Sequence, residues 1–573
     1  MPSSMSSQDE QRTAAPTQPK VRFQLRALEY VTVCAVLWML AALLQWKAGA
    51  FAVELSGNPD ESAHYITGLM IRDYIASGQF TSPMTYAEHY YAHYPKIAFG
   101  MWPPFFHITE ALWTLIFSPG KISVLSLMAL IAAATGTSIY YVLRRKYGRT
   151  AAFAGGALFV LAPLVQASTS AVMADGLVAL LDLWAMIYLV RYLESERTRA
   201  AVVFGVFTAL SMATKANGVA LVLLPILAVP LTRRWHLLRA RGLYYAAAII
   251  LVFGAPWPAL SYWLIKRSMG GEAVTALVIA GTALAYVRVL WATLGWGLSL
   301  FCVLGMAGFL VGLWRNHTDF TLAGSFALLL SVWAYHSLIG NGADRYMVGA
   351  LPPALILTAA GFVWAARRIL PHAVPLSARA AVLGALAAGV FVTQTWAVPH
   401  KPYQGFDQPA HFLLTTPEFA AGNFLVISHA RGEGAFITEV AMHDHRPGHL
   451  VLRSTKVLSS TNWYGSVYHL RYKNSKEICN FLDRAPIDAV LLDTRPAQVW
   501  LDDAAFQLGR KVSEALQSDP NWKLRDHFPK LRDTAPWIDL YSRVGPQPTG
   551  SIELDLRYTL GKDIVATEGK DGK

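Results

Sequence analysis

The sequence predicts a polytopic α-helical membrane protein with about eleven transmembrane helices and an α/β domain outside the membrane. Three observations predict this fold class. Hydrophobic residues make up 54% of the 573 residues and charged residues only 15%, which excludes a soluble multidomain enzyme of this length. Apolar runs long enough to cross a bilayer recur before residue 400. After residue 400 the pattern changes to short runs of strand type.

Eleven apolar runs lie before residue 400, and a run of roughly 17 to 25 residues crosses about 30 Å of hydrocarbon. The fifth and sixth runs are short. The expected spans are residues 28–49, 120–143, 150–168, 174–190, 200–214, 217–232, 243–264, 291–313, 320–339, 347–366 and 378–397. The moderately apolar stretch 272–290 is expected to form an external interfacial or re-entrant helix, because another full span would reverse the charge pattern after it.

The formal net charge of +12 indicates the topology. Residues 1–399 hold 28 basic and 16 acidic residues, whereas residues 400–573 hold 21 of each. Nineteen basic residues, against six acidic ones, fall on alternate loops between the predicted helices. Lys and Arg in short loops stay on the cytoplasmic side, so we expect the amino terminus in the cytoplasm and the carboxyl terminus outside. The positive charge therefore does not indicate a nucleic-acid partner.

The chain is expected to have three regions. They are a disordered cytoplasmic tail (residues 1–26), a transmembrane module (27–399) with a large first external loop (50–119), and an external α/β domain (400–573). The tail is rich in Ser, Gln and Pro, and it lacks the apolar core and cleavage site of a signal peptide.

Short apolar runs in the last region predict a small open sheet. Strand-type runs occupy residues 424–428, 489–493 and 537–541, and helical patterns near 433–444 and 498–517 lie between them. Strands alternating with helices are typical of an α/β fold.

Acidic residues follow the first span closely. The segment Gly57-Asn-Pro-Asp-Glu-Ser-Ala-His64 places Asp60 and Glu61 after a proline that suits the start of a helix. In that helix Asp60 and His64 lie four residues apart and share a face. An ordinary acidic helix start, stabilised by the helix dipole, is the alternative interpretation.

Three more charged residues are expected on the same side of the membrane. Asp175 opens the fourth span, Lys215 lies between the two short spans, and Arg345 precedes the tenth. Charges at membrane depth are costly and are functional candidates by default, and short helices that meet at a polar point often mark a binding site. A helix cap for Asp175 and snorkelling for the two cations are the alternatives.

The first external loop is also rich in histidine and aromatic residues. His89, His93, Lys96 and Trp102 lie there, and such residues at an interface usually serve as membrane anchors. A zinc site at His89 and His93 is the less favoured interpretation, because two His four residues apart without an HExxH motif lack a third ligand.

The charges on this side suit one kind of chemistry. An ionised carboxylate within reach of an acceptor hydroxyl is a general base, and a leaving phosphate needs cationic stabilisation. Asp60 fits the first role, and Lys96, Lys215 or Arg345 fits the second.

These features resemble the GT-C superfamily of membrane glycosyltransferases that use polyprenyl-phosphate sugars, especially the protein O-mannosyltransferases and the lipid A aminoarabinose transferases. The resemblance covers residues 28 to about 366. It rests on the order of these motifs: Asp60-Glu61 after the first span, Pro103-Pro104 later in the loop, Met173-Ala-Asp-Gly176 at the fourth span, Thr214-Lys215 with Gly218 between the short spans, and Arg345-Tyr346 with Pro352-Pro353 in the tenth.

The resemblance implies roles for individual residues. Asp60 would be the catalytic base or the carboxylate that orients the acceptor, with Glu61 beside it and Asp175 as the second acid of the site. The substrate-binding candidates are His64, Lys96, Trp102, Lys215, Arg345 and Tyr346. Trp102 stands where the aminoarabinose transferases have Lys and the mannosyltransferases tend to have His, which would move the phosphate contact to Lys96 or reflect a different donor sugar.

We therefore expect an inverting glycosyltransferase, with inversion implied by the resemblance. It would take a sugar from a polyprenyl-phosphate donor and give it to a lipid, glycan or protein acceptor on the external face. The only glycosylation sequon, at Asn316, falls in an expected cytoplasmic loop, which favours a bacterial inner membrane with a periplasmic carboxyl-terminal domain. The cofactor stays open, a divalent metal included, because members of the superfamily differ in metal dependence.

Two other classes of function remain as alternatives. Eleven spans with charged residues also suit a secondary transporter, although transporters usually have paired repeats and charges near the midplane. A scaffold for cell-envelope assembly, recruiting partners through its α/β domain, is the second alternative.

Overall fold

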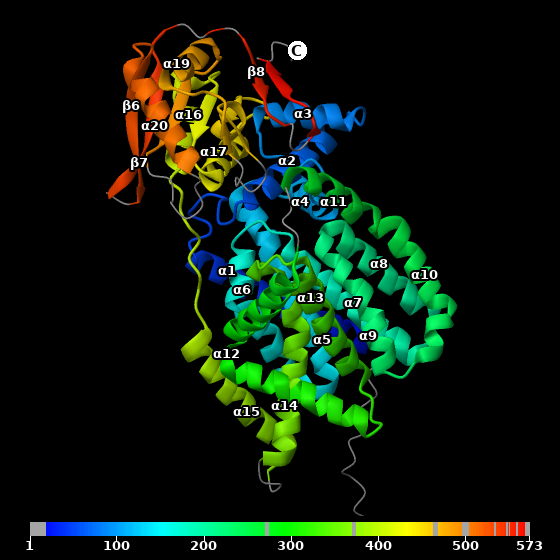
Figure 1. Ribbon diagram of the computed structural model, residues 1–573. Helices are drawn as coiled ribbons and strands as arrows, with labels where there is room; N and C mark the ends of the chain where they lie inside the picture. The colour runs from blue at the N-terminus through cyan, green and yellow to red at the C-terminus, as the bar shows by residue number, and fades with distance from the viewer. Residues whose placement is uncertain are drawn as a thin grey trace, which may run out of the picture.

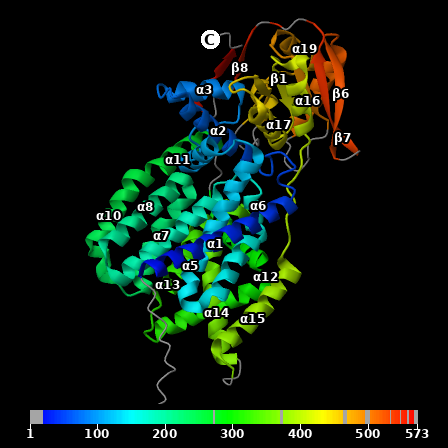
Figure 2. The same ribbon diagram turned by 180° about the vertical axis from the view of Figure 1, so that it is seen from behind.

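A computed structural model describes residues 19–269, 274–369, 374–461, 468–494, 503–531, 534–545, 548, 550–556 and 560–567. The chain forms a helical bundle with an α/β domain at one end (Figure 1). Helices of the first external loop lie between the two (Figure 2). This arrangement agrees with the predicted fold class.

Among the described residues, the bundle contains eight helical segments that are long and apolar enough to cross a membrane. They are Arg26–Lys47, Lys121–Leu161, Asp175–Ser195, Arg241–Leu264, Ala276–Trp314, Phe320–Ile339, Asp344–Arg368 and Leu376–Thr395. Two shorter apolar segments, Thr198–Thr214 and Ala216–Leu231, correspond to the short fifth and sixth predicted spans. Each of the eleven predicted spans falls on helical structure, and the number of crossings stays a prediction.

The elements of the bundle follow in chain order. They are α1 (Pro19–Lys47), α5 (Lys121–Leu161), α6 (Pro163–Thr169), α7 (Asp175–Ser195), α8 (Thr198–Thr214), η1 (Ala216–Val222), α9 (Leu223–Leu231), η2 (Trp235–Arg239), α10 (Arg241–Ile249), η3 (Ile250–Gly254), α11 (Pro256–Met269), α12 (Ala276–Trp314), α13 (Phe320–Ile339), η4 (Asp344–Ala350), α14 (Leu351–Ile369), α15 (Leu376–Val390) and η5 (Phe391–Thr395).

Two glycines divide long helices. Gly148 in α5 has φ 81° and Gly295 in α12 has φ 70°, a left-handed conformation that glycine adopts without steric cost. Gly148 separates the predicted second and third spans. The two arms of α5, before and after Gly148, pack closely against each other. A Cβ on Gly136 in the first arm would lie 2.9 Å from the carbonyl oxygen of Gly156 in the second. The predicted external helix at 272–290 is helical from Ala276, as the first arm of α12.

The predicted tail differs from the structure at its end. Residues 1–18 lie outside the described residues, and α1 begins at Pro19, so residues 19–26 are helical rather than disordered. Proline suits the first position of a helix, and the residues that follow it contain no glycine or further proline that would delay the helix start.

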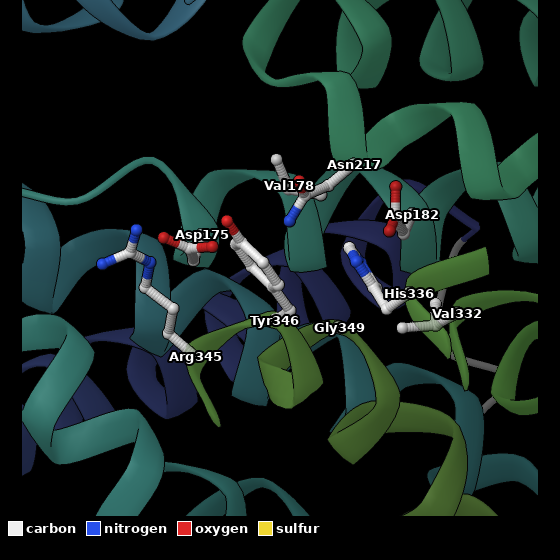
Figure 3. A pocket seen from close by; sticks show the side chains of 9 residues that line it. All are labelled: Asp175, Val178, Asp182, Asn217, Val332, His336, Arg345, Tyr346 and Gly349. Carbon is white, nitrogen blue, oxygen red and sulfur yellow. The ribbon is translucent and has the colours of Figure 1, made fainter. Parts of the chain in front are cut away.

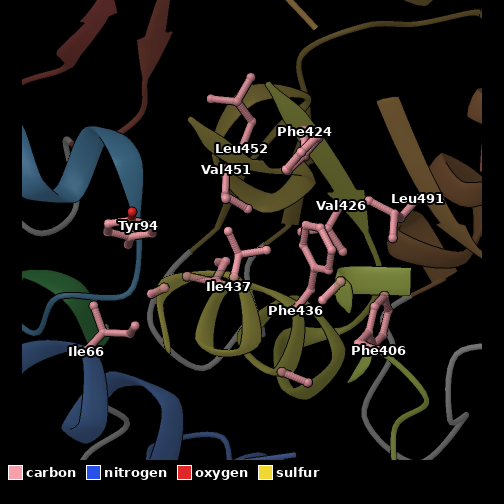
Figure 4. Close-up of a cluster of buried hydrophobic side chains, with 14 of the residues drawn as sticks. Ile66, Tyr94, Phe406, Phe424, Val426, Phe436, Ile437, Val451, Leu452 and Leu491 are labelled. Carbon is pink, nitrogen blue, oxygen red and sulfur yellow. The ribbon is translucent and has the colours of Figure 1, made fainter. Parts of the chain in front are cut away.

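The first external loop contains three helices, α2 (Glu61–Ser77), α3 (Pro83–His93) and α4 (Phe105–Ile116). The helix expected after Pro59 is α2, and Asp60 is its N-cap residue. Its buried first half, which includes Ile66, packs on the α/β domain (Figure 4).

The α/β domain is built on a five-stranded sheet in the order β2-β1-β5-β7-β6. Strand β1 pairs in parallel with β2 and β5, and β7 pairs antiparallel with β5 and β6. The strands of the sheet are β1 (Phe424–Ile427), β2 (Val451–Arg453), β5 (Ala489–Asp493), β6 (Trp522–Leu531) and β7 (Thr534–Arg543). All three strand-type runs of the sequence are strands of this sheet, which confirms the predicted α/β character.

Helices and two small hairpins complete this domain. The helices are α16 (Asp407–Thr415), η6 (Pro417–Phe419), α17 (Ala430–His443), α18 (Ser454–Val457), α19 (Ser475–Arg484) and α20 (Asp503–Ser518). The hairpins pair β3 (Ser459–Thr461) with β4 (Tyr468–Leu470) and β8 (Ser551–Leu554) with β9 (Ile564–Thr567).

Helix α17 fixes the α/β domain against the first external loop. Tyr94 donates a hydrogen bond to Asp444 at 2.7 Å, and a Cβ on Gly434 would lie 2.4 Å from the Ser62 hydroxyl. Buried side chains of both regions form one hydrophobic cluster, in which Tyr94 and Ile437 lie on facing elements (Figure 4). The start of α2, which carries Asp60, is therefore held between two packed units.

Candidate active site

Asp60 forms an ion pair with Arg345. As the N-cap of α2 its side chain makes no capping hydrogen bond; instead its Oδ2 accepts from Arg345 Nη2 at 2.6 Å. Arg345 lies in η4, 285 residues further along the chain. The Asp60 side chain therefore pairs with a cation from a distant element rather than with the backbone of α2.

A second ion pair joins Asp175 and Lys215. The Lys215 ammonium lies 2.8 and 3.0 Å from the two carboxylate oxygens of Asp175, and both residues are at most 5% exposed. Lys215 interrupts the helix at the α8–η1 junction with extended backbone, φ −159° and ψ 148°, which turns its side chain inward. Because both charges are buried, breaking the pair would leave an uncompensated charge.

Tyr346 lies between the two ion pairs. The Lys215 ammonium is 5.1 Å from the centre of its ring, and the Arg345 guanidinium carbon is 5.6 Å from it. Both are within cation–π distance. The structure thus brings together Asp60, Asp175 and the two cations around one aromatic ring.

A small cavity of about 10 Å³ adjoins these residues (Figure 3). It is lined by Asp175, Val178, Asp182, Asn217, Val332, His336, Arg345, Tyr346 and Gly349. Its three other polar side chains, Asp182, Asn217 and His336, were not among the sequence candidates. A signal was present for Asp182, an isolated carboxylate seven residues after Asp175 in the same span, because that spacing returns to the same helix face.

A second cavity of about 180 Å³ also has Arg345 in its lining. Its lining includes apolar residues of α6 and the following segment as well as the chain between η5 and α16: Gly57, Asn58, Leu164, Ala167, Ser168, Ser170, Ala171, Met173, Arg345, Pro399, His400, Lys401 and Pro402. Arg345 is therefore shared by a small polar cavity and a larger, mostly apolar one.

Glu61 lies beside Asp60 but has different partners. It is fully buried, and it accepts from Lys401 Nζ at 2.7 Å and from the backbone of Gly57 and Val172 at 2.6 and 3.2 Å. It lines neither cavity. These contacts tie the start of α2 to the segment before α7 and to the chain after the last span.

His64 and His107 form a buried pair on α2 and α4. His64 Nδ1 and His107 Nε2 are 3.1 Å apart, and Trp102 stacks on His64 with ring centres 4.1 Å apart. His107 also hydrogen-bonds the backbone of Pro103. Because proline has no backbone N–H, His107 donates to the Pro103 carbonyl and its Nε2 accepts from His64 Nδ1. His64 Nε2 is then left as a buried acceptor without a partner among the described residues.

Both histidines are held neutral. Burial lowers the pKa of His107 to about 4, and burial followed by repulsion from His107 holds the pKa of His64 well below its usual value. Unfolded histidine titrates near pH 6.5, so the stability that the pair contributes is complete above about pH 6.5 and is lost as the pH falls toward 4.

This gives a prediction for the pH dependence of stability. The double variant His64→Gln/His107→Gln should lose less of its melting temperature than the wild type when the pH falls from 7 to 4.5 in detergent. The exposed His411 provides the control, since His411→Gln should keep the wild-type slope. Equal slopes for the double variant and the wild type would contradict the assignment.

Lys96 and Trp102 line neither cavity. Lys96 donates to the Ala430 carbonyl of α17 at 3.1 Å. Burial is the main reason why its pKa falls to about 7, with the charge of Arg453 next. The structure thus joins Lys96 to the α/β domain, and Trp102 to His64.

The metal hypothesis finds no support in the donor set. Across the described residues, no group of three His, Cys, Asp or Glu side chains could hold a metal ion. His93 uses its Nδ1 on the Gly448 carbonyl at 2.8 Å.

Known proteins resemble the chain in sequence and in structure. A sequence family described as dolichyl-phosphate-mannose-protein mannosyltransferase matches residues 102–263. Among solved structures, ArnT from Cupriavidus metallidurans bound to undecaprenyl phosphate superposes with a TM-score of 0.54 and 15% identity over 91% of this chain and 99% of that one. Apo ArnT from the same organism gives 0.54 and 14% over 92% and 100%. The chain shares the fold of ArnT.

A third solved structure is less similar. It is the archaeal oligosaccharyltransferase AglB from Archaeoglobus fulgidus in complex with an inhibitory peptide and a dolichol-phosphate, with a TM-score of 0.48 and 13% identity over 89% of this chain and 75% of that one. No curated protein matches the sequence.

The GT-C resemblance drawn from the sequence is confirmed at the level of fold. The matched family stretch contains Trp102, Asp175 and Lys215, whereas Asp60 and Arg345 lie outside it. The family match supports a glycosyltransferase activity that uses a lipid-phosphate carrier; the residue roles within the GT-C fold stay predictions.

Proposed function

We propose that the protein is an inverting membrane glycosyltransferase that transfers a sugar from a polyprenyl-phosphate donor to a lipid, glycan or protein acceptor on the external face of the membrane. The observation that carries the proposal is the meeting of two ion pairs, Asp60–Arg345 and Asp175–Lys215, at one end of the bundle of a GT-C fold. It supplies a carboxylate base beside two cations. Inversion rests on the resemblance to the superfamily.

Each charged group has a place in the proposed reaction. The Asp60 carboxylate takes the proton of the acceptor hydroxyl while that oxygen forms a bond to the anomeric carbon of the sugar. The bond between the anomeric carbon and the phosphate oxygen breaks, and the electron pair leaves with the carrier phosphate. Arg345 and Lys215 stabilise the phosphate charge that develops.

The ion pair between Asp60 and Arg345 suggests how the base becomes available. Arg345 holds Asp60 at 2.6 Å, and its Nε is buried without a partner among the described residues. A phosphate can accept two parallel hydrogen bonds from one guanidinium. In the proposed sequence the donor phosphate replaces Asp60 on Arg345, which frees the carboxylate for the acceptor.

The larger cavity suits the carrier lipid. Leu164, Ala167, Ala171 and Met173 offer apolar surface next to Arg345, and an isoprenyl phosphate needs apolar contacts beside a cation. ArnT, whose fold this chain shares, has been solved with undecaprenyl phosphate bound, so we take that lipid as the probe for the carrier.

We further propose a bacterial inner membrane as the location, with the α/β domain in the periplasm. The charge pattern of the loops supports this orientation. A transporter would need a path open in turn to both sides, and a scaffold would not need a carboxylate paired with cations at depth. Both alternatives predict no covalent product.

The proposed function is tested by comparing lipid, glycan and protein extracts of cells with and without the gene by mass spectrometry. Loss of the enzyme should remove one sugar mass from an acceptor and raise the level of the sugar-linked polyprenyl phosphate. Identical extracts under conditions in which the gene is expressed would count against a transferase.

The phosphate site makes a prediction for donor binding. Arg345→Gln should weaken binding of undecaprenyl phosphate about 10- to 100-fold, because a charge-assisted hydrogen bond contributes roughly 1.5–3 kcal/mol. The measurement is a titration of the purified protein in nanodiscs. Arg288, an exposed arginine in the first arm of α12, provides the control. Arg288→Gln should bind undecaprenyl phosphate like the wild type. An equal loss of binding in both variants would point to general charge attraction instead.

A further inference from the structure

We propose that the small cavity is a subsite for hydroxyl groups of the transferred sugar. The hydroxyls would form hydrogen bonds with Asp182, Asn217 and His336. The inference rests on the proposed function and deepens it, because it assigns the sugar a place apart from the carrier phosphate. All three side chains line the cavity behind the two ion pairs (Figure 3).

Three separate elements supply these side chains. Asp182 lies two turns after Asp175 on α7, about 10 Å deeper at 1.5 Å per residue. His336 lies one turn after the lining residue Val332 on α13, and Asn217 comes from η1. Polar groups at this depth are costly and are retained mainly for function. Their convergence from three elements makes this a built site.

The three side chains retain hydrogen-bonding capacity. Asp182 is 2% exposed, and only its Oδ1 has a partner among the described residues, the Ser211 hydroxyl at 2.6 Å. His336 is 3% exposed and contacts aromatic rings, including Tyr286 and Tyr346. Among the described residues, the ring nitrogens of His336 have no hydrogen-bond partner, and neither does the Asn217 amide. These groups line the cavity, where their remaining donors and acceptors are open to a ligand that carries hydroxyls.

The chemistry of the set indicates a sugar rather than the phosphate or the lipid. A carboxylate repels phosphate, whereas carboxylate, amide and imidazole groups together accept from and donate to hydroxyls. An apolar chain would leave all three groups unpaired. The mouth of the site has the opposite character, since Arg345 and Lys215 are cations. A donor with its phosphate at the mouth and its sugar at the deep end would satisfy both the cations and the three polar groups.

Tyr346 controls access to this subsite. The cavity volume of about 10 Å³ is the space of about one water molecule, and the Tyr346 ring lies between Asp175 and His336 (Figure 3). The ring stacks on His336 with centres 4.9 Å apart, and it contacts both cations. A sugar that reaches Asp182 must therefore displace this ring, and movement of the cations toward a phosphate would loosen it.

The test separates the sugar from its carrier. Purified protein in nanodiscs is titrated with undecaprenyl phosphate alone and with undecaprenyl phosphates that carry glucose, mannose or arabinose. The variants are Asp182→Asn, which keeps the shape of the side chain, and His336→Gln. Ser331→Ala is the matched control, because Ser331 is a fully buried polar residue of α13 outside the cavity lining.

We expect the wild type to bind at least one sugar-linked lipid more tightly than the bare carrier. Asp182→Asn and His336→Gln should each reduce that preference about 10-fold or more, while binding of bare undecaprenyl phosphate stays at the wild-type level, which also reports a folded protein. Ser331→Ala should keep the preference. An unchanged preference in both variants, or no preference for any sugar in the wild type, would overturn the subsite. Failure of the wild type to bind the bare carrier would instead contradict the proposed function itself.

Discussion

Replacing Asp60 by Asn is expected to reduce sugar transfer about 10²- to 10⁴-fold, the range that a general base contributes. Asn has nearly the same shape, and its oxygen can still accept the hydrogen bond that Arg345 donates at 2.6 Å. It cannot take the proton of the acceptor hydroxyl. Folding and donor binding should therefore stay close to those of the wild type while turnover falls.

The measurement is product formation in cells that lack the chromosomal gene and carry either variant or wild-type copies. Asp344 offers a matched control, because it is an exposed aspartate directly before Arg345. Asp344→Asn makes the same chemical change without touching the base and should restore the product fully. Near-normal product from a well-folded Asp60→Asn protein would remove the assigned base.

The second large effect concerns the Glu61–Lys401 pair. Lys401→Ala should destabilise the protein by about 3–5 kcal/mol, because it leaves the fully buried Glu61 carboxylate without its counter-charge. The same change removes a contact between the chain after the last span and the helix that carries Asp60. Activity should fall together with stability.

A double variant distinguishes two causes of the lost stability, an unpaired buried charge and lost packing. Glu61→Gln/Lys401→Met removes both charges and keeps most of the volume, and pairs replaced in this way often lose little stability. Its melting temperature in detergent should recover most of the way to the wild type. If Lys401→Ala alone melts like the wild type, the pair does not fix the start of α2.

The sequence was most informative where one physical rule acts locally. Apolar length and the charge of short loops depend on the bilayer alone, and short strand-type runs predicted β1, β5 and β7 before any pairing was known. The predicted end of the disordered tail, at residue 26, differs from the structure. A polar composition rich in Ser, Gln and Pro does not reveal that a helix begins at Pro19.

The candidate site was predictable as a set of residues but not as a set of pairs. Asp60, Asp175, Lys215 and Arg345 stand out because charges near membrane spans are costly. Which carboxylate meets which cation depends on how α2, α7 and η4 pack, and Asp60 and Arg345 are 285 residues apart.

The residues that sequence reasoning missed had weak local signals. Asp182 is a single carboxylate within an apolar span, and His336 sits near the end of another, where a core histidine is the ordinary interpretation. Lys401 follows the last predicted span and resembles a boundary charge. Only the packing of the chain after that span against the first external loop reveals its partner Glu61.

The most direct test of the central claim is a transfer assay with the purified protein in proteoliposomes. Undecaprenyl phosphate that carries a radiolabelled sugar is supplied together with a lipid and glycan extract from the host membrane. Transfer should release one free undecaprenyl phosphate for each labelled sugar that appears on an acceptor, and Asp60→Asn should reduce both about 10²- to 10⁴-fold. Movement of label across the membrane without release of the carrier phosphate, or equal release by the variant, would contradict a glycosyltransferase that uses Asp60 as its base.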